Sequence, residues 1–438
     1  MSFHPRVTKG DAYRMSQLEA KFPSMINVLD GEQHRRKRRI VGQAITERSM
    51  RAFEPVMSAQ VNVFLQQILK SCERDDYVDM TERCARLGVD IIALLAFGFP
   101  LKTQTESRYQ FLPASMDQTS WRMNIYMQFP PIKPIERFLS WIGYADSARF
   151  KKTIGAMIYA RKSQDKDAQH DLYSVIASYM SKENQEFLRG ELWPEAILFI
   201  LAGGATTASA MAATFFYLTR NLDSYSTLEK EIRSTFSSAE EITAGSKLAS
   251  CKYLRACIDE ALRISPPTST LLWRGEEAGN DNRSDPFVID GHVIPKGTQV
   301  AVSLYSLLHN EKYYPDPFSY KPERWLEPSG EEAGAETEEQ RFSREIMRRA
   351  FAPFMLGDRG CAGKAMAYLE LSLTLARTVW YFDFEAAPGK AGQVGGGIAG
   401  RTDGRGRPDE FQTYDMFIAS HYGPNVVFRK RGEYWRSL

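Results

Sequence analysis

Helical spacing of apolar residues dominates this chain. The clearest stripe lies between Tyr253 and Ile264, where apolar side chains recur at positions i, i+3, i+4, i+7 and i+8 and two prolines follow. Short strand patterns gather in the second half, and we find no internal repeat or dividing linker. We therefore predict one mainly α domain, 1–438, with small β-sheets. Predicted helices are 33–47, 52–72, 80–97, 147–161, 171–181, 192–221, 224–237, 252–264 and 363–382; predicted strands are 268–273, 287–289, 299–303, 416–419 and 425–428.

One predicted helix contains an uncharged stretch, 196–218, that is long enough to span a bilayer. Its centre consists of glycine, alanine, serine and threonine, and a helix buried through a large domain is also apolar on every side. We predict a buried helix rather than a transmembrane one. The first 31 residues are polar and mixed, so we expect no signal peptide and no transmembrane anchor in the chain as given.

Composition excludes several classes of protein. Of the 438 residues 43% are hydrophobic, and the net charge is only +2, which gives no overall nucleic-acid footprint. Five cysteines without metal-ligand spacing favour a reducing compartment over a disulfide framework. The acidic segment 327–340 and the glycine-rich segment 386–407 are predicted to be flexible surface insertions.

The most informative chemistry lies in residues 354–363, Phe-Met-Leu-Gly-Asp-Arg-Gly-Cys-Ala-Gly. Cys361 comes just before a predicted helix, whose backbone N–H groups and dipole should stabilise a thiolate and lower its pKa. The glycines allow the backbone to approach a flat cofactor, and Arg359 suits a carboxylate. A buried structural cysteine is the alternative.

This segment resembles the haem-binding signature of the cytochrome P450 superfamily, and three further motifs stand in family order. Glu260 and Arg263, with Arg324 of a Pro-Glu-Arg-Trp segment, correspond to the buried ion network of the family. Residues 202–207, Ala-Gly-Gly-Ala-Thr-Thr, correspond to its distal helix. The similarity runs from about His34 to Arg431. The resemblance implies that the haem is bound by Cys361, Phe354, Gly357, Arg359, Gly363, His34, Arg38 and Arg274.

The resemblance also implies a cytochrome P450 fold and a function. Haem b would be held by the axial thiolate of Cys361, its metal ligand. The expected enzyme is a haem-thiolate monooxygenase that oxidises a small organic molecule with O2 and electrons from NADPH through NADPH-cytochrome P450 reductase. The overall pattern is similar to filamentous-fungal members that modify secondary metabolites. The substrate pocket is expected to be lined by 10–30, 199–207, 268–272 and 416–421.

The distal motif departs from the family at one position. The resemblance makes Thr206 and Thr207 the catalytic hydroxyls, with a glycine that lets the helix widen for dioxygen. Ala205 stands where the family has an acid, so proton delivery would need the threonines, water or the substrate. Threonines that only bond back to helix carbonyls are one alternative. A haem-thiolate dehydratase, isomerase or peroxygenase is another.

The basic run 34–39 first suggests a nuclear-localisation or nucleic-acid patch. We favour a positive proximal face, shared with Arg348, Arg349 and Lys364, that receives an acidic electron donor such as the reductase, and we expect no nucleic acid. The resemblance further implies a monomer on the cytosolic side of the endoplasmic reticulum.

The start of the chain also departs from the family. The membrane anchor, the first helices and the first sheet strands have no counterpart in the sequence. We interpret the chain as either a truncated version or a reduced family member. An inactive haem-binding remnant therefore stays open as a further alternative.

Overall fold

A computed structural model describes residues 7–17, 22–135, 144–164, 171–174, 185–276, 286–328 and 337–438. These residues form a mainly helical fold with small sheets, which confirms the predicted fold class. The helices are α1 (Ala12–Met15), α2 (Gly31–Ala44), α3 (Glu47–Arg74), α4 (Met80–Phe97), α5 (Leu112–Gln128), α7 (Tyr144–Lys162), α9 (Gln185–Ile200), α10 (Thr206–Leu218), α11 (Leu222–Thr235), α12 (Ser246–Ala249), α13 (Lys252–Ile264), α14 (Leu304–Leu308), α16 (Glu338–Ala350), α17 (Lys364–Tyr381) and α18 (Gly389–Gly392).

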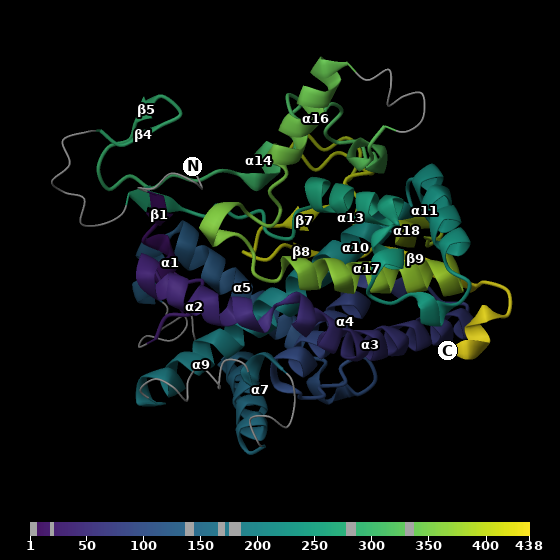
Figure 1. The fold of residues 1–438 in the computed structure, drawn as a ribbon, viewed down its shortest axis with the longest axis horizontal. Helices are drawn as coiled ribbons and strands as arrows, with labels where there is room; N and C mark the ends of the chain where they lie inside the picture. Colours follow the sequence, from purple (N-terminus) through teal and green to yellow (C-terminus); the bar gives the residue numbers. More distant parts are fainter. Residues whose placement is uncertain are drawn as a thin grey trace.

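The core is a stack of long helices. Figure 1 shows α3, α4, α10, α13 and α17 running roughly along the long axis of the molecule, and α17 contacts α3, α10 and α13. Every residue of α10 after its first is buried, which explains why the sequence there is apolar on all sides. Each large apolar side chain buried in this stack contributes roughly 1.5–3 kcal/mol.

Four small antiparallel sheets flank the helices in the part of the chain that the structure describes. Strand β1 (Val7–Lys9) pairs with β3 (Arg274–Glu276), placing Lys9 opposite Arg274. Strand β9 (Asn425–Lys430) lies between β2 (Val78–Asp79) and β6 (Phe382–Ala386). Two hairpin pairs complete the set: β4 (Val288–Ile289) with β5 (His292–Val293), and β7 (Thr413–Tyr414) with β8 (Ser420–His421).

Several predicted strands were wrong in position. The predicted strand 268–273 contains no strand and ends where β3 begins, and 299–303 contributes only a single bridge, between Val300 and Arg274. Residues 416–419 form the bend between β7 and β8. The segment 416–419 carries strand-like side chains because most of it is buried, whereas 299–303 is partly exposed. None of these segments forms a ladder with a neighbouring strand, and a strand-like composition alone does not create one.

Helix predictions were more accurate. The bounds of α4 and α13 match the prediction, whereas the longer helices α5 and α16 and the short helices α1, α12, α14 and α18 were not predicted. Helix α16 starts inside the segment predicted to be an acidic insertion, because Thr337 and Gln340 form a capping box. Residues 329–336 of that insertion and 175–181 of a predicted helix lie outside the described residues.

The long helix predicted over 192–221 is interrupted. Helix α9 leads into η3 (Leu201–Ala205), a π-helical turn, which α10 continues. A Cβ on Gly88 of α4 would lie 2.4 Å from the carbonyl oxygen of Gly204, so glycine at 88 permits α4 to pack against the widened turn. Among the described residues, Leu192–Leu218 is the one span long and apolar enough to cross a membrane, and 67% of its apolar window is buried.

The flexibility of the glycine-rich segment 386–407 stays a prediction, and its glycines have a packing role in the structure. Gly397 N donates to the carbonyl of Arg407 at 2.9 Å, and Ile398 N donates to that of Arg405. A Cβ on Gly396 would lie 2.2 Å from the carbonyl oxygen of Pro408. The glycines therefore allow backbone segments to pack against one another.

Candidate functional site

A cavity of about 310 Å³ gathers most of the residues predicted for the site. Its walls come from the loop before α17, from α2, from η3 and α10, and from the segments 267–274 and 417–418. Gly357, Glu260, Arg263 and Arg324 do not line it. The predicted site residues that line it are Phe354, Arg359, Cys361, Gly363, His34, Arg38, Arg274, Thr206 and Thr207.

The loop that carries Cys361 is folded tightly. Cys361 N donates to the carbonyl of Phe354 at 2.8 Å, and Gly360 N donates to that of Gly357 at 2.9 Å. Gly357 has φ +70°, a left-handed conformation that glycine adopts without strain. The ring of Phe354 contacts Tyr368 of α17, which anchors the loop to the helix. The thiol is thereby directed to the cavity.

The electrostatics of Cys361 correct one prediction. Burial raises the pKa of the Cys361 thiol, while the backbone N–H groups of Gly363 and Lys364 and the charge of Arg38 act in the opposite direction. The helix terminus that the sequence predicted to lower the pKa is present, but burial outweighs it. Coordination to a metal ion deprotonates a thiol. A thiol with a raised pKa is a poor free nucleophile, whereas a metal ion bound to Cys361 would deprotonate it.

Five basic residues, Lys9, His34, Arg38, Arg274 and Arg359, face the cavity and are named here the basic cluster. No Asp or Glu is found among the described residues that line it. The pKa of His34 falls to about 3 through burial and the charges of neighbouring Lys9 and arginines. Burial and the charges of Arg359 and Arg274 lower the pKa of Lys9 well below its usual value. The positive charges of the basic cluster therefore repel one another.

The basic cluster and Cys361 fit a haem. Arg359 Nη1 is buried and has no hydrogen-bond partner among the described residues, which is costly unless an anion completes it. A haem carries two carboxylates, and arginine binds carboxylates in a bidentate manner. Arg274 Nη1 is already oriented by Tyr13, to whose hydroxyl it donates at 3.0 Å. Cys361 would hold the iron, and His34 with the three arginines of the basic cluster would hold the carboxylates, because Lys9 Nζ already donates to backbone carbonyls.

The distal wall shows the predicted widening. The π-helical turn ends at Ala205, directly before Thr206. Thr206 Oγ1 donates to the carbonyl of Ala202 at 2.6 Å, and Thr207 Oγ1 donates to that of Gly203 at 3.1 Å. Both hydroxyls thus bond back to the helix, as in the structural alternative, and Thr206 would have to rotate to donate into the cavity.

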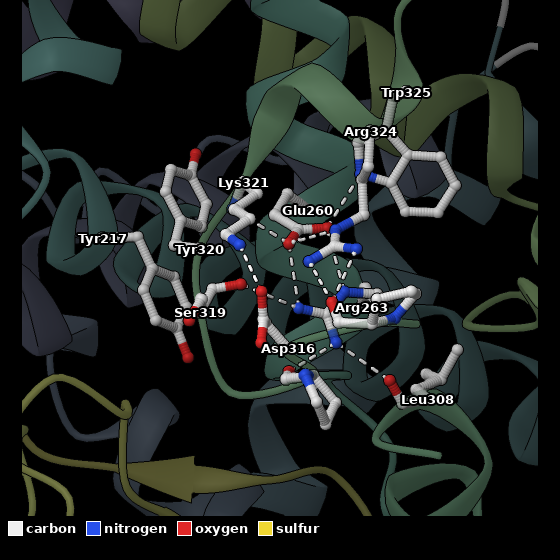
Figure 2. Close-up of polar contacts among 12 residues, drawn as sticks. Tyr217, Glu260, Arg263, Leu308, Asp316, Ser319, Tyr320, Lys321, Arg324 and Trp325 are labelled. Atoms are coloured by element: carbon white, nitrogen blue, oxygen red, sulfur yellow. Dashed lines mark hydrogen bonds and ion pairs between the residues drawn. The ribbon is translucent and has the colours of Figure 1, made fainter. Parts of the chain in front are cut away.

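The three residues assigned to the ion network lie together, away from the cavity. Figure 2 shows Glu260 between Arg263 and Arg324. Glu260 Oε1 accepts from Arg263 Nη2 and Arg324 Nε, both at 2.9 Å, and from the backbone N of Lys321 at 3.0 Å. Its Oε2 accepts from Arg263 Nε and Trp325 Nε1, both at 2.9 Å. The side chains of Glu260 and Arg263 are fully buried.

Arg263 uses its remaining donors on backbone carbonyls. Nη1 donates to Leu308 and Pro317, at 2.9 and 2.7 Å, and Nη2 donates to Ser319 at 3.2 Å. All five N–H groups of the guanidinium are therefore bonded. The network joins α13 to the segment 308–325, and it carries no free group that could act on a ligand.

The predicted positive face is only partly basic at the surface. Arg35, Arg39, Arg348, Arg349 and Lys364 are exposed. Lys37, which the sequence grouped with them, is buried and pairs with Glu195 of α9 at 2.9 Å. Lys37 therefore ties α2 to α9 and does not face a partner.

Four of the residues that sequence reasoning missed have a clear effect on the site. Lys9 and Glu195 bind the loop that carries Met25, and Ser120 and Met123 of α5 line the cavity. No motif in the neighbouring sequence identifies these four residues. The apolar stripe of α5 is interrupted by buried Ser115, Ser120 and Asn124, which hides the helix from a periodicity search.

Comparison with known proteins agrees with this geometry. A family model described as Cytochrome P450 matches residues 10–393. A cytochrome P450 monooxygenase of Gibberella zeae is 31% identical, over 97% of this chain and 95% of the relative. Cytochrome P450 monooxygenase poxM of Penicillium oxalicum is 33% identical, over 92% and 74%. Cytochrome P450 monooxygenase AKT7 of Alternaria alternata is 30% identical, over 98% and 81%.

Proposed function

The chain belongs to the cytochrome P450 family and is a monooxygenase of that family, and from this premise we propose that it oxidises a neutral, largely apolar small molecule. The oxidant would be dioxygen, with electrons from NADPH through a reductase. The cofactor would be haem b with the Cys361 thiolate as its axial ligand. The supporting observation is that Cys361, the basic cluster and Thr206 line the same cavity.

The substrate class follows from the walls of the cavity. Met25, Met123, Phe199 and Phe417 are among its many apolar lining residues, and the charged lining residues all belong to the basic cluster. No described carboxylate lines the cavity to bind a cationic substrate, and the basic cluster is the place where the haem carboxylates would bind. An apolar wall also excludes water from the reacting atoms. We infer a neutral molecule, and the fungal relatives support an intermediate of fungal secondary metabolism.

The chemistry divides between cofactor and protein. When bound, haem supplies the iron at which dioxygen reacts, and a thiolate ligand favours cleavage of the O–O bond. Thr206 Oγ1 would hold a proton at the distal wall after turning from the carbonyl of Ala202. Because Ala205 has no carboxyl group, water or a polar group of the substrate would deliver that proton.

The partner would be NADPH-cytochrome P450 reductase. The exposed basic residues Arg35, Arg39, Arg348 and Lys364 support a docking face for an acidic electron donor. Family membership supports an enzyme associated with the cytosolic side of the endoplasmic reticulum. Raising the salt concentration should slow reduction by the reductase, because such a face is screened.

The absorption spectrum of the reduced protein with carbon monoxide tests the proposal. We expect a Soret band at the position typical of thiolate ligation, and loss of that band in Cys361→Ala. NADPH and reductase should then support oxygen-dependent turnover of a metabolite that accumulates when the gene is deleted. A purified wild-type protein without haem would contradict the proposal and favour an inactive remnant.

A second function is supported by Ala205 and by the inward bonding of Thr206. A haem-thiolate dehydratase, isomerase or peroxygenase does not need proton delivery to dioxygen. Such an enzyme would show the thiolate band but would convert its substrate without NADPH and reductase, with peroxide in the peroxygenase case. Turnover that requires the reductase would exclude all three.

A further inference from the structure

The loop formed by residues 24–28 is held by two buried charged side chains from distant parts of the chain. Lys9 Nζ donates to the carbonyls of Met25 and Ile26, both at 2.8 Å, and to that of Val28 at 3.4 Å. Glu195 Oε1 accepts from the backbone N of Met25 at 2.8 Å. Met25 is therefore bound at its amide by one charged group and at its carbonyl by another.

This arrangement matters for the cavity because of where the loop lies. Met25 and Ile26 line the cavity, and so does Lys9. Glu195 lies on α9, the helix that continues into the widened turn η3 and Thr206. The two contacts thus connect the cavity wall at Met25 to the strand that carries Lys9 and to the distal helix.

Charged neighbours act on both residues. Burial and the charges of Arg359 and Arg274 lower the pKa of Lys9 well below its usual value, and the charge of Glu195 opposes that shift. Lys37 pairs with the same oxygen of Glu195 that Met25 binds, at 2.9 Å. Buried charged groups hydrogen-bond more strongly than neutral ones, so they fix a backbone position more firmly than neutral side chains would.

Other contacts hold the remainder of the loop. Asn27 Nδ2 donates to the carbonyl of Tyr13 at 3.0 Å and to Ser16 Oγ at 2.6 Å, and Ser24 Oγ donates to Asn27 Oδ1 at 2.6 Å. These neutral contacts lie at the two ends of the turn. The charged contacts act at Met25 and Ile26, whose side chains form the wall.

We propose that Lys9 and Glu195 are positioning residues that hold Met25 and Ile26 as a wall of the substrate cavity and so determine which ligands fit. The role in specificity rests on the proposed haem-thiolate function, whereas the positioning itself does not. Neither residue touches the reacting atoms in this role. Loss of this positioning role should change which ligands the cavity prefers, because a mobile wall no longer selects ligands by size and shape.

Two ligands of the haem iron give a probe of that preference. Imidazole and 1-benzylimidazole both bind iron through a ring nitrogen, but only the second extends to the walls. We expect the ratio of their dissociation constants, from absorbance titration of the haem-loaded protein, to change about tenfold in Lys9→Met and Glu195→Ala. Lys9→Arg keeps the charge and should stay within about threefold of the wild type. An unchanged ratio in both loss variants would overturn the proposal.

A matched control is available in Arg377, a buried cation that also binds a backbone carbonyl. Its Nη2 donates to Ile242 at 2.9 Å, and neither residue lines the cavity. Arg377→Met should lower stability without changing the ratio. A change equal to that in Lys9→Met would mean that the ratio reports general loosening, and the proposal would fail.

Hydrogen exchange of residues 22–30 tests the positioning whether or not haem is retained. Exchange should be about tenfold faster in Lys9→Met and Glu195→Ala than in the wild type or in Arg377→Met. Exchange at the wild-type rate would overturn the proposal. Absence of the thiolate band from wild-type protein, with fast exchange in the two variants, would instead contradict the proposed function and leave the positioning role intact.

Discussion

Two groups of buried charged residues in this molecule differ in whether the protein itself supplies their partners. In the ion network, Glu260 accepts five hydrogen bonds, and every N–H of Arg263 is bonded within the protein. In the basic cluster, like charges face one another, no described carboxylate lines the cavity, and Arg359 Nη1 lacks a partner.

This difference distinguishes buried charges that hold the fold together from buried charges that would bind a ligand. Burial by itself does not distinguish them, because most members of both groups are buried. In a closed group of charges every member is paired, so removal of one partner leaves an uncompensated buried charge. An open group of like charges destabilises the fold until an external anion arrives, so its presence indicates a ligand. Substitutions in the two groups should therefore have effects of opposite sign on the haem-free protein.

The largest effect is expected from Glu260→Gln. This substitution leaves Arg263 and Arg324 as buried cations without a counterion, which typically costs about 3–5 kcal/mol. Denaturant unfolding of the purified protein should give a midpoint far below that of the wild type. Low yield of soluble protein would point in the same direction.

The double variant Glu260→Met with Arg263→Met provides the control. It removes a charge and its main partner together, so it should cost less than Glu260→Gln alone. A Glu260→Gln cost within about 1 kcal/mol of zero would show that the network is not closed as the contacts indicate.

In the basic cluster, Arg359→Leu should weaken haem binding without destabilising the haem-free protein. Loss of a guanidinium that would bind a haem carboxylate is expected to lower haem affinity on the order of a hundredfold. Stability of the haem-free form should stay equal or rise, because Arg359 lowers the pKa of Lys9 and His34. Haem transfer to excess haem-free myoglobin measures the first quantity, and denaturant unfolding measures the second.

Arg220→Leu serves as the comparison, since Arg220 is partly buried, donates to the carbonyl of Gly392 and does not line the cavity. It should leave haem transfer unchanged. If Arg359→Leu lowered the stability of the haem-free protein as much as Glu260→Gln does, the basic cluster would be stabilising the fold like the ion network, and the contrast between them would be wrong.

The same contrast explains what could be predicted from sequence. Helices α4 and α13 were found because their apolar faces repeat locally, and the Cys361 loop was found because its residues are adjacent. Helix α5 was missed because the partners of its buried polar face are remote: Asn124 Nδ2 donates to the carbonyl of Asp415.

Charged residues were hardest to place for the same reason. Lys37 stands in a basic run that looks like a surface patch, yet its partner Glu195 is 158 positions away. Lys9 binds carbonyl oxygens, which have no signature in a sequence. The family resemblance predicted the ion network, while the contacts of Lys9 and Glu195 required the fold.

A pH titration sharpens the comparison through His34. Its pKa is lowered to about 3 in the haem-free fold, against 6.5 when unfolded, through burial and neighbouring cations. The unfolded chain therefore binds more protons below pH 6.5, so stability falls as pH drops from 6.5 towards 3, by about 2 kcal/mol at pH 5. In His34→Gln, unfolding measured from pH 7.5 to pH 5 should show a flatter curve.

Bound haem should reduce this dependence, because carboxylates beside His34 favour its protonated form. The wild-type curve of the haem-loaded protein should then lie closer to that of His34→Gln. Parallel curves for wild type and variant in the haem-free form would mean that His34 does not titrate differently on folding.

The smallest effect is expected from Trp325→Phe in the ion network. The substitution removes one neutral donor, Nε1, which lies 2.9 Å from Glu260 Oε2, and it keeps the aromatic contact with Phe351. Because Glu260 retains its other four donors, the cost should be about 1 kcal/mol, the usual value for one hydrogen bond. Denaturant unfolding measures it, and haem content should not change. A loss of unfolding free energy as large as that of Glu260→Gln would show that the network needs every one of its hydrogen-bond donors. A small loss would show that the network tolerates the loss of one neutral donor and is disrupted only when a charged member is removed.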